Sequence, residues 1–188
     1  MIPVGYMAKH IVERPAWLKA AGVIDIYSVS GCISPDWADF INYWKHNGYW
    51  FFDSPEAIRS LANEHSIDVT GTRLFYYEAR EQEFDEYGRV WRPFFPEPSF
   101  ITKVVPPAER YLEGYDVVSF YARTSPECSP LSCNSLASEL ETNQHCLLSS
   151  EGEALKLLEG GVFQRSEPGP YRVFSVSSVQ VPMWPEGG

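Results

Sequence analysis

The sequence lacks the short motifs that mark the common catalytic and nucleotide-binding sites. It contains no glycine-rich phosphate loop, no Gly-x-Ser-x-Gly turn, no His-Glu-x-x-His motif and no Walker pattern. Its paired glycines, at 160–161 and 187–188, are predicted to end a helix and the chain. No reaction class is therefore indicated by a motif.

Long apolar runs are absent as well. The first ten residues hold no apolar stretch of signal-peptide length, and no segment approaches the length of a membrane-spanning helix. We therefore expect a cytoplasmic protein whose four cysteines stay reduced, because the cytosol keeps thiols reduced. A chain of 188 residues, 44% of them hydrophobic, can bury a core without disulfides.

Basic residues are scarce: 15 Lys and Arg stand against 25 Asp and Glu, and the net charge is −10. This balance argues against nucleic-acid binding, which needs a basic surface over the phosphates, and against an anionic membrane surface. It permits electrostatic steering toward a basic protein partner. Simple solubility is the alternative explanation of the charge.

The second half of the chain echoes the first. Residues 47–54 (NGYWFFDS) resemble residues 143–150 (NQHCLLSS), 96 positions later, and Cys32 and Cys128 are the same distance apart. A Ser-Pro step follows each of these two cysteines closely. Chance likeness is the alternative, but a true repeat would relate the two halves by a pseudo-twofold axis.

Local patterns give each half the same order of elements: strand, loop, helix, short strand, capped helix and long strand. In the first half these are a strand at 23–29, a helix at 36–44, a short strand at 49–52, a helix from Ser54 to His65, a strand from 72 to 84, and a turn at 86–89 before a return strand at 90–92. In the second half they are a strand at 116–121, helix at 134–140, short strand at 145–148, helix from Ser150 with Glu153 in a capping box, and strand at 171–177.

The expected fold class is therefore α+β, with a mixed or antiparallel sheet and helices packed on it. We expect one domain, 1–188, built as a pseudo-duplication of two similar β-α-β-α-β halves, 22–92 and 114–181. The connection at 93–113 is predicted to be extended, because five prolines between 93 and 107 remove backbone donors and exclude a central strand.

The densest charge feature is the predicted hairpin between residues 78 and 91. If its first strand is continuous, Glu81, Glu83 and Asp85 share one face. Such carboxylates can simply be solvated, hold a divalent metal, act as an acid–base pair or present a negative stripe to a partner. Neighbouring aromatic residues favour the stripe over the metal site and the acid–base pair. The predicted partner-binding residues are Glu78, Glu81, Glu83, Asp85, Glu86 and Trp91.

A second candidate site gathers thiols and an imidazole from Cys128, Cys133, His145 and Cys146. These groups are zinc ligands, and Cys32 completes the set if the two halves pack together. The four residues between Cys128 and Cys133 differ from the usual Cys-x-x-Cys knuckle, however. The same residues are also compatible with a reactive thiol that uses a histidine base, His145 or His46, or with buried cysteines that act as small apolar residues.

The leading prediction is a non-enzymatic cytoplasmic binding or inhibitor protein without a cofactor or a metal, which presents an acidic, aromatic-rich surface to a basic protein partner. In general character the chain is similar to the immunity proteins, or antitoxins, of bacterial toxin systems and to anti-CRISPR inhibitors. This likeness implies a basic toxin or nuclease effector as partner, rather than nucleic acid or a membrane. The alternative is a small enzyme or zinc-binding protein that uses Cys128, Cys133 and His145.

Overall fold

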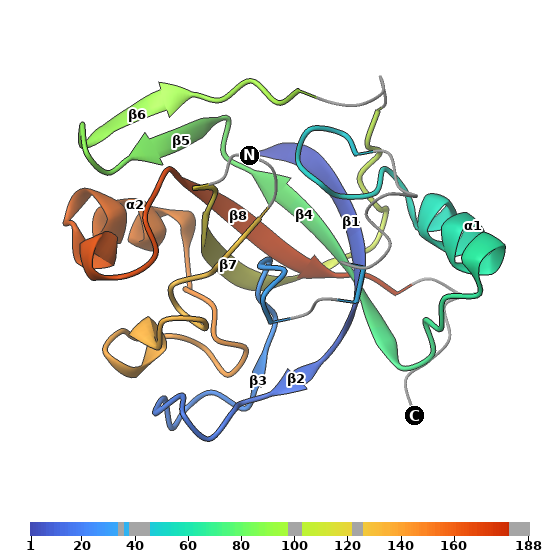
Figure 1. Cartoon of the computed structure of the whole chain (residues 1–188), viewed down its shortest axis with the longest axis horizontal. Helices are drawn as coiled ribbons and strands as arrows, with labels where there is room; N and C mark the ends of the chain where they lie inside the picture. Colours follow the sequence, from blue (N-terminus) through green and yellow to red (C-terminus); the bar gives the residue numbers. More distant parts are fainter. Residues whose placement is uncertain (34–35, 38–45, 98–102, 122–125, 181–188) are drawn as a thin grey trace.

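The computed structural model describes residues 1–33, 36–37, 46–97, 103–121 and 126–180. Within them lie a 6-stranded antiparallel sheet and two α-helices, which confirms the predicted α+β class (Figure 1). The strand order is β1-β4-β8-β5-β6, and β7 pairs with the other edge of β8. The strands are β1 (Ile2–His10), β4 (Thr72–Ala79), β5 (Gln82–Asp85), β6 (Val90–Pro93), β7 (Tyr111–Ser119) and β8 (Tyr171–Ser178).

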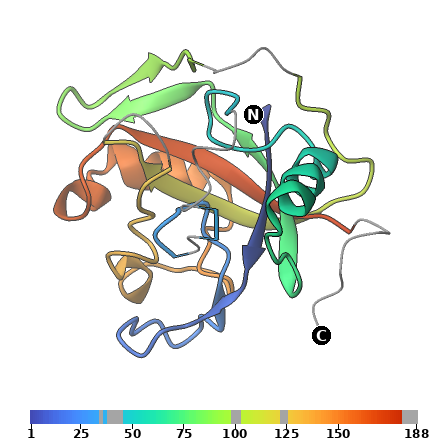
Figure 2. The same cartoon turned by 45° about the vertical axis from the view of Figure 1, so that its right-hand side comes forward.

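The helices lie at opposite sides of this sheet, α1 (Pro55–His65) beside β1 and α2 (Glu151–Glu159) beside β7 and β8 (Figure 1). In the turned view of Figure 2, α1 still lies against β1. The remaining elements are the small two-stranded sheet of β2 (Val12–Glu13) and β3 (Asp25–Ile26) and the 3-10 turns η2 (Leu136–Ser138) and η3 (Val162–Arg165).

Both α-helices begin where the sequence predicts. The Ser54 hydroxyl accepts a hydrogen bond from the amide of Ala57 at 3.2 Å, and the Ser150 hydroxyl accepts one from the amide of Glu153 at 3.2 Å. The Glu153 carboxylate reaches back to the amide of Ser149 at 3.1 Å, one residue earlier than a standard capping box requires. These side chains satisfy amides that the first helical turn leaves unpaired.

Several predicted elements are shorter than expected. The strand predicted at 23–29 is limited to β3, and the helix predicted at 134–140 is the 3-10 turn η2. The short strands at 49–52 and 145–148 are each reduced to one bridge, Tyr6 with Phe52 and Tyr115 with Leu148. The strand predicted from 72 to 84 is broken between β4 and β5. Most of the helix predicted at 36–44 lies outside the described residues.

The strand β1, which no sequence pattern predicted, occupies the same place beside β4 as β7 does beside β8. Gly5 of β1 pairs with Tyr77, and Gly114 of β7 pairs with Val176. Each glycine follows a shift of register and has a positive φ, 138° and 152°. Tyr77 and Val176 in turn pair with each other where β4 meets β8. The two outer strand pairs therefore share one geometry on either side of the β4–β8 junction.

The apolar interior forms two clusters. One contains Ile58 of α1 with Phe174 and Val176, and the other contains Leu158 of α2 with Val173. β8 thus contributes side chains to both clusters, because successive side chains of a strand point to opposite faces of the sheet. None of the helices in the described part of the chain has the length and apolar character that crossing a membrane requires.

Candidate metal centre

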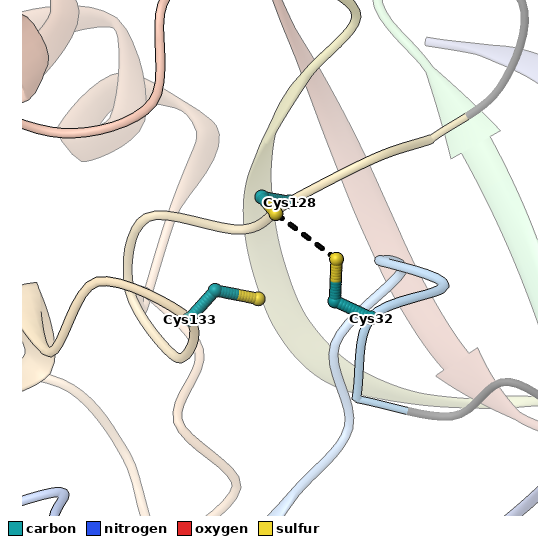
Figure 3. Close-up of side chains that lie close together, drawn as sticks. All are labelled: Cys32, Cys128 and Cys133. Atoms are coloured by element: carbon teal, nitrogen blue, oxygen red, sulfur yellow. Dashed lines mark hydrogen bonds between the residues drawn. The ribbon is translucent and has the colours of Figure 1, made fainter.

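Three cysteines from two distant chain segments meet beside β7. The sulfur atoms of Cys32, Cys128 and Cys133 all lie within 4.8 Å of one another. Cys32 Sγ and Cys128 Sγ lie 3.0 Å apart, and their residues are 96 positions apart in the sequence. Figure 3 shows the Cys133 sulfur pointing toward this pair from the loop that also carries Cys128. The fold therefore brings together the two cysteines of the sequence echo and adds a third.

Backbone hydrogen bonds fix the loop that carries Cys128 and Cys133. The amide of Ser119, at the end of β7, donates to the carbonyl of Cys128 at 2.8 Å, and the amide of Glu127 donates to the carbonyl of Ser119 at 3.1 Å. The amide of Cys133 donates to the carbonyl of Ser129 at 2.7 Å. This i to i−4 bond coils the chain between the two cysteines into one turn, and the sulfur of Cys133 lies within 4.8 Å of that of Cys128.

Ser30 connects the first cysteine loop to the second. Its hydroxyl donates to the carbonyl of Glu127 and accepts from the amide of Cys32 at 3.1 Å. The same oxygen lies 3.7 Å from the sulfur of Cys133. A single serine thus contacts both loops and orders the backbone of Cys32.

The carboxylate of Asp116, on β7, makes a second connection between the loop of Cys32 and the loop of Cys128 and Cys133. Its Oδ2 accepts hydrogen bonds from the Ser28 hydroxyl at 2.9 Å and the Val29 amide at 2.8 Å, and its Oδ1 accepts one from the Ser129 hydroxyl at 2.6 Å. Asp116 is fully buried. Burial raises the pKa of this carboxyl, and the three hydrogen bonds oppose that rise.

A buried ammonium group binds the backbone of residues 28–30, in the loop that leads to Cys32. Lys9, in β1, is 5% exposed and donates to the carbonyl oxygens of residues 28, 29 and 30 at 2.8, 3.1 and 2.9 Å. Burial lowers its pKa from 10.5 to about 8, while the nearby charges of Asp116, Asp36 and the thiols of Cys133 and Cys32 act in the opposite direction. The thiol cluster therefore has a positive group as a neighbour.

Burial disfavours the thiolate form of Cys128 and Cys133. Burial, together with the neighbouring sulfur atoms, raises the pKa of Cys128, and burial raises the pKa of Cys133. A nucleophilic cysteine needs a lowered pKa, because the thiolate is the reactive form. The raised pKa values of Cys128 and Cys133 therefore disfavour a nucleophilic role for these two thiols, whereas a bound metal would deprotonate them.

The structure does not bring His145 and Cys146 into this group. The Nδ1 atom of His145 lies 2.5 Å from a carboxylate oxygen of Asp25, and its ring stacks on Tyr27 with centroids 3.9 Å apart. Cys146 is buried in the cluster that contains Leu158. The predicted set was Cys128, Cys133 and His145. In the structure Cys32 takes the place of His145 beside Cys128 and Cys133.

The predicted partner-binding residues of the hairpin are mostly engaged within the fold. Glu83 and Asp85 lie on the face of β5 opposite the buried Phe84, as the period of two predicts. Glu86 accepts a hydrogen bond from the Tyr171 hydroxyl at 3.0 Å. Trp91 donates to a carboxylate oxygen of Glu159 at 2.8 Å. The ion pairs of the remaining acids are Glu78–Arg110 (2.9 Å), Glu83–Arg172 (3.2 Å) and Asp85–Arg92 (2.6 Å). Glu81 alone among the six is exposed.

One of these pairs is part of an aromatic stack. The guanidinium carbon of Arg172 lies 3.2 Å from the ring centroid of Phe94 and 3.8 Å from that of Phe120. Burial lowers the pKa of Arg172 to about 10, and Glu83 opposes this effect. Phe94, one of the aromatic residues near the hairpin, therefore covers a buried cation of the sheet.

Sequence reasoning missed the groups that support the thiols, namely Lys9, Ser28, Ser30, Asp116 and Ser129. A usable signal was present for Asp116, which opens an otherwise apolar strand pattern at 116–121. An acid in such a position is buried only when polar groups satisfy it. Their distribution over four separate segments could not be inferred without the fold.

Comparison with known proteins adds no relative. The chain matches no protein-family model, no curated protein and no solved structure.

Proposed function

We propose that this chain is a zinc-binding protein in which Cys32, Cys128 and Cys133 hold the ion as thiolates. The observation that carries the proposal is the placement of three sulfur atoms within 4.8 Å of one another. Zinc–sulfur bonds of about 2.3 Å in a tetrahedral site place sulfur atoms about 3.8 Å apart. The Cys32 and Cys128 sulfurs, 3.0 Å apart, would separate by roughly 0.8 Å around the ion.

Charge supports the same ligand set. Three thiolates and a zinc ion together carry one negative charge, which the buried ammonium of Lys9 can balance. Zinc must displace the thiol protons, because burial holds those of Cys128 and Cys133 in place. Binding would therefore release protons and would weaken as the pH falls.

The ion would act as a clamp between two parts of the chain. Cys32 belongs to the loop after β3, whereas Cys128 and Cys133 belong to the loop after β7. An ion that binds only the folded arrangement stabilises it by mass action. We therefore propose that zinc holds these two loops together.

Metal content tests the proposal directly. We expect about one zinc ion per chain when the protein is produced and purified with zinc present and without chelators. Cys32→Ser, Cys128→Ser and Cys133→Ser should each lose most of that zinc, whereas Cys146→Ala should retain it. Zinc-free wild-type protein, or equal zinc in all four variants, would refute the site.

We further propose that the chain arose by internal duplication. The first copy comprises β1, residues 47–54, α1 and β4; the second comprises β7, residues 143–150, α2 and β8. Matching bridges support it, since Tyr6 pairs with Phe52 as Tyr115 pairs with Leu148. These copies begin earlier than the halves suggested by sequence, because β1 rather than β3 corresponds to β7.

A second candidate function is binding of a basic protein partner, of the toxin-immunity or anti-CRISPR kind, through the β5–β6 hairpin. It is favoured by the exposed aromatic rings of Tyr87 (82%) and Phe95 (80%), which accompany the exposed carboxylate of Glu81. Exposed aromatic residues beside acids can anchor and steer a partner. The acids paired with arginines within the fold contribute less to such a surface.

Affinity capture from the native cell distinguishes a partner-binding role of this acidic surface from a role in solubility alone. A specific basic partner should be retained by the wild type, lost with Tyr87→Ala or Glu81→Lys, and released by salt. Tyr121→Ala, which alters a 63% exposed tyrosine outside the hairpin, is the matched control. Equal capture by all of these variants would remove the hairpin from consideration.

A further inference from the structure

We infer that zinc at this centre keeps a fourth coordination position that no protein side chain fills and that accepts a small thiolate from solution. The inference rests on the proposed zinc site and specifies its chemistry. Structural zinc sites are closed by four protein ligands, whereas sites that exchange ligands have three protein ligands and an open position. The question is therefore whether the chain offers a fourth donor.

The supply of soft donors can be counted. The chain has four cysteines and four histidines, and all eight fall within the described residues. Three cysteines form the cluster, and the fourth, Cys146, is buried in the apolar cluster beside α2. The fourth cysteine of the chain is thus not positioned to bind the same ion.

The four imidazoles are engaged elsewhere. His145 binds Asp25, and His10 places Nδ1 2.5 Å from a carboxylate oxygen of Asp36. The ring of His46 stacks on Trp50 with centroids 3.9 Å apart. The contact of His65 is with Glu64 on α1, at 3.9 Å. Within the described ranges, no imidazole nitrogen or carboxylate oxygen comes within 4.8 Å of all three sulfur atoms.

The cluster is also open to solvent. Cys32 is exposed, and Cys128 and Cys133 are half-buried. An ion bound to these sulfurs is therefore within reach of small molecules, unlike an ion sealed inside the apolar core. With a fourth thiolate the site carries two negative charges, of which the buried ammonium of Lys9 offsets one.

The proposed exchange is a simple substitution. Water occupies the fourth position at rest. An incoming thiol gives its proton to the buffer, its sulfur bonds to zinc, and the water leaves; no electron is transferred. A thiolate is the favoured ligand because soft sulfur donors already define the preference of this site.

X-ray absorption spectroscopy of the zinc-loaded protein tests this. In a thiol-free buffer we expect about three sulfur neighbours and one oxygen neighbour per zinc, and about four sulfur neighbours after saturation with 2-mercaptoethanol. Removal of the small thiol by gel filtration should restore the first spectrum. Cys146→Ala, as matched control, should show the same exchange.

The two proposals fail in different ways. Absence of zinc, or zinc without sulfur neighbours, would refute the zinc site itself. Three sulfur neighbours with an imidazole as the fourth ligand, or three that stay three at saturating thiol, would leave the zinc site standing and overturn the open position.

Discussion

Asn47 and Asn143 make the same hydrogen bonds in the two halves of the molecule. The side-chain amide of Asn47 donates to the carbonyl of Val4 at 2.7 Å, and that of Asn143 donates to the carbonyl of Glu113 at 2.7 Å. In both cases the acceptor residue precedes the positive-φ glycine of an outer strand. Each asparagine oxygen also accepts from the backbone amides two and four residues later. One side chain thus joins each outer strand to the turn before its helix.

Removal of either asparagine should destabilise the fold by a similar amount. Asn47→Ala and Asn143→Ala each leave a carbonyl and two amides without this partner, and we expect a loss of about 2–3 kcal/mol. Urea unfolding followed by circular dichroism measures it. Asn134→Ala, at an exposed position, is the control and should change the free energy of unfolding by less than about 0.5 kcal/mol. A large loss of unfolding free energy in only one of the two variants would show that the two asparagines contribute unequally to stability despite their similar hydrogen bonds.

The two outer-strand glycines should not tolerate a side chain. A Cβ at Gly5 would lie 2.6 Å from the Cβ of Phe51, and a Cβ at Gly114 would lie 2.8 Å from the Cβ of Leu147. We expect Gly5→Ala and Gly114→Ala to cost more than about 2 kcal/mol each, from steric overlap added to backbone strain.

Two other glycines separate these causes. Gly71 has a positive φ of 76° but nothing within 4 Å of the added carbon, so Gly71→Ala should cost only about 1 kcal/mol. Gly22→Ala meets neither obstacle and should be close to neutral. Thermal unfolding of the four variants gives the ranking, and equal losses at Gly5 and Gly71 would contradict the packing argument.

Asp116 should affect both stability and zinc affinity. Asp116→Ala leaves two serine hydroxyls and a backbone amide without their acceptor, and we expect a loss of about 3 kcal/mol together with weaker zinc binding. Asp116→Asn should be milder, because the amide oxygen still accepts from Val29 while the Ser129 hydroxyl turns to accept from the nitrogen. Ser129→Ala removes one contact and should fall between wild type and Asp116→Ala. Zinc competition with a chromophoric chelator measures the affinity, and an unchanged affinity in Asp116→Ala would show that the carboxylate does not order the thiol loops.

The buried Lys9 predicts a rise in stability at alkaline pH. Its pKa is about 8 in the folded protein and 10.5 as a free side chain, so between these values the unfolded chain binds more protons. The free energy of unfolding of wild type, minus that of Lys9→Met, should therefore increase by up to about 3 kcal/mol as the pH rises across this interval. Denaturant titrations of the metal-free, reduced proteins measure the difference. Tyrosines with raised pKa values act in the opposite direction, but they are common to both proteins and cancel. Parallel pH profiles would contradict a lowered pKa of Lys9 in the folded protein.

The elements with strong local signals were predictable from the sequence. The capped helices α1 and α2 and the strand β8 agree closely with the expected ranges, and β4 begins where expected, because capping residues and apolar patterns are local properties. β1 was missed because Pro3 and Gly5 interrupt its pattern. Both residues are tolerated in an outer strand with a bulge, which is where β1 lies. A Gly-Tyr pair at 5–6 that recurs at 114–115 was the available clue.

The candidate site was only partly predictable, because it depends on tertiary contacts. Cys32 and Cys128 are separated by the same 96 positions as the two similar segments, which predicted comparable places in the two halves. This spacing did not predict that their sulfur atoms are in contact. The segment at 23–29 has the composition of a strand, yet its carbonyls at residues 28–30 bind Lys9 instead of a neighbouring strand. Tertiary context overrides strand propensity there.

The central position of β8 has a consequence for how the chain is made. β8 is the last strand in the described part of the sequence, yet it pairs with β7 along one edge and with β4 and β5 along the other. During synthesis, β4 and β7 therefore emerge from the ribosome long before their shared partner exists, and each offers an unpaired edge until Ser178 has been added. The sheet closes as one late event that waits for the synthesis of β8, and a ribosome stalled before Tyr171 would display two strand edges open to association with other chains.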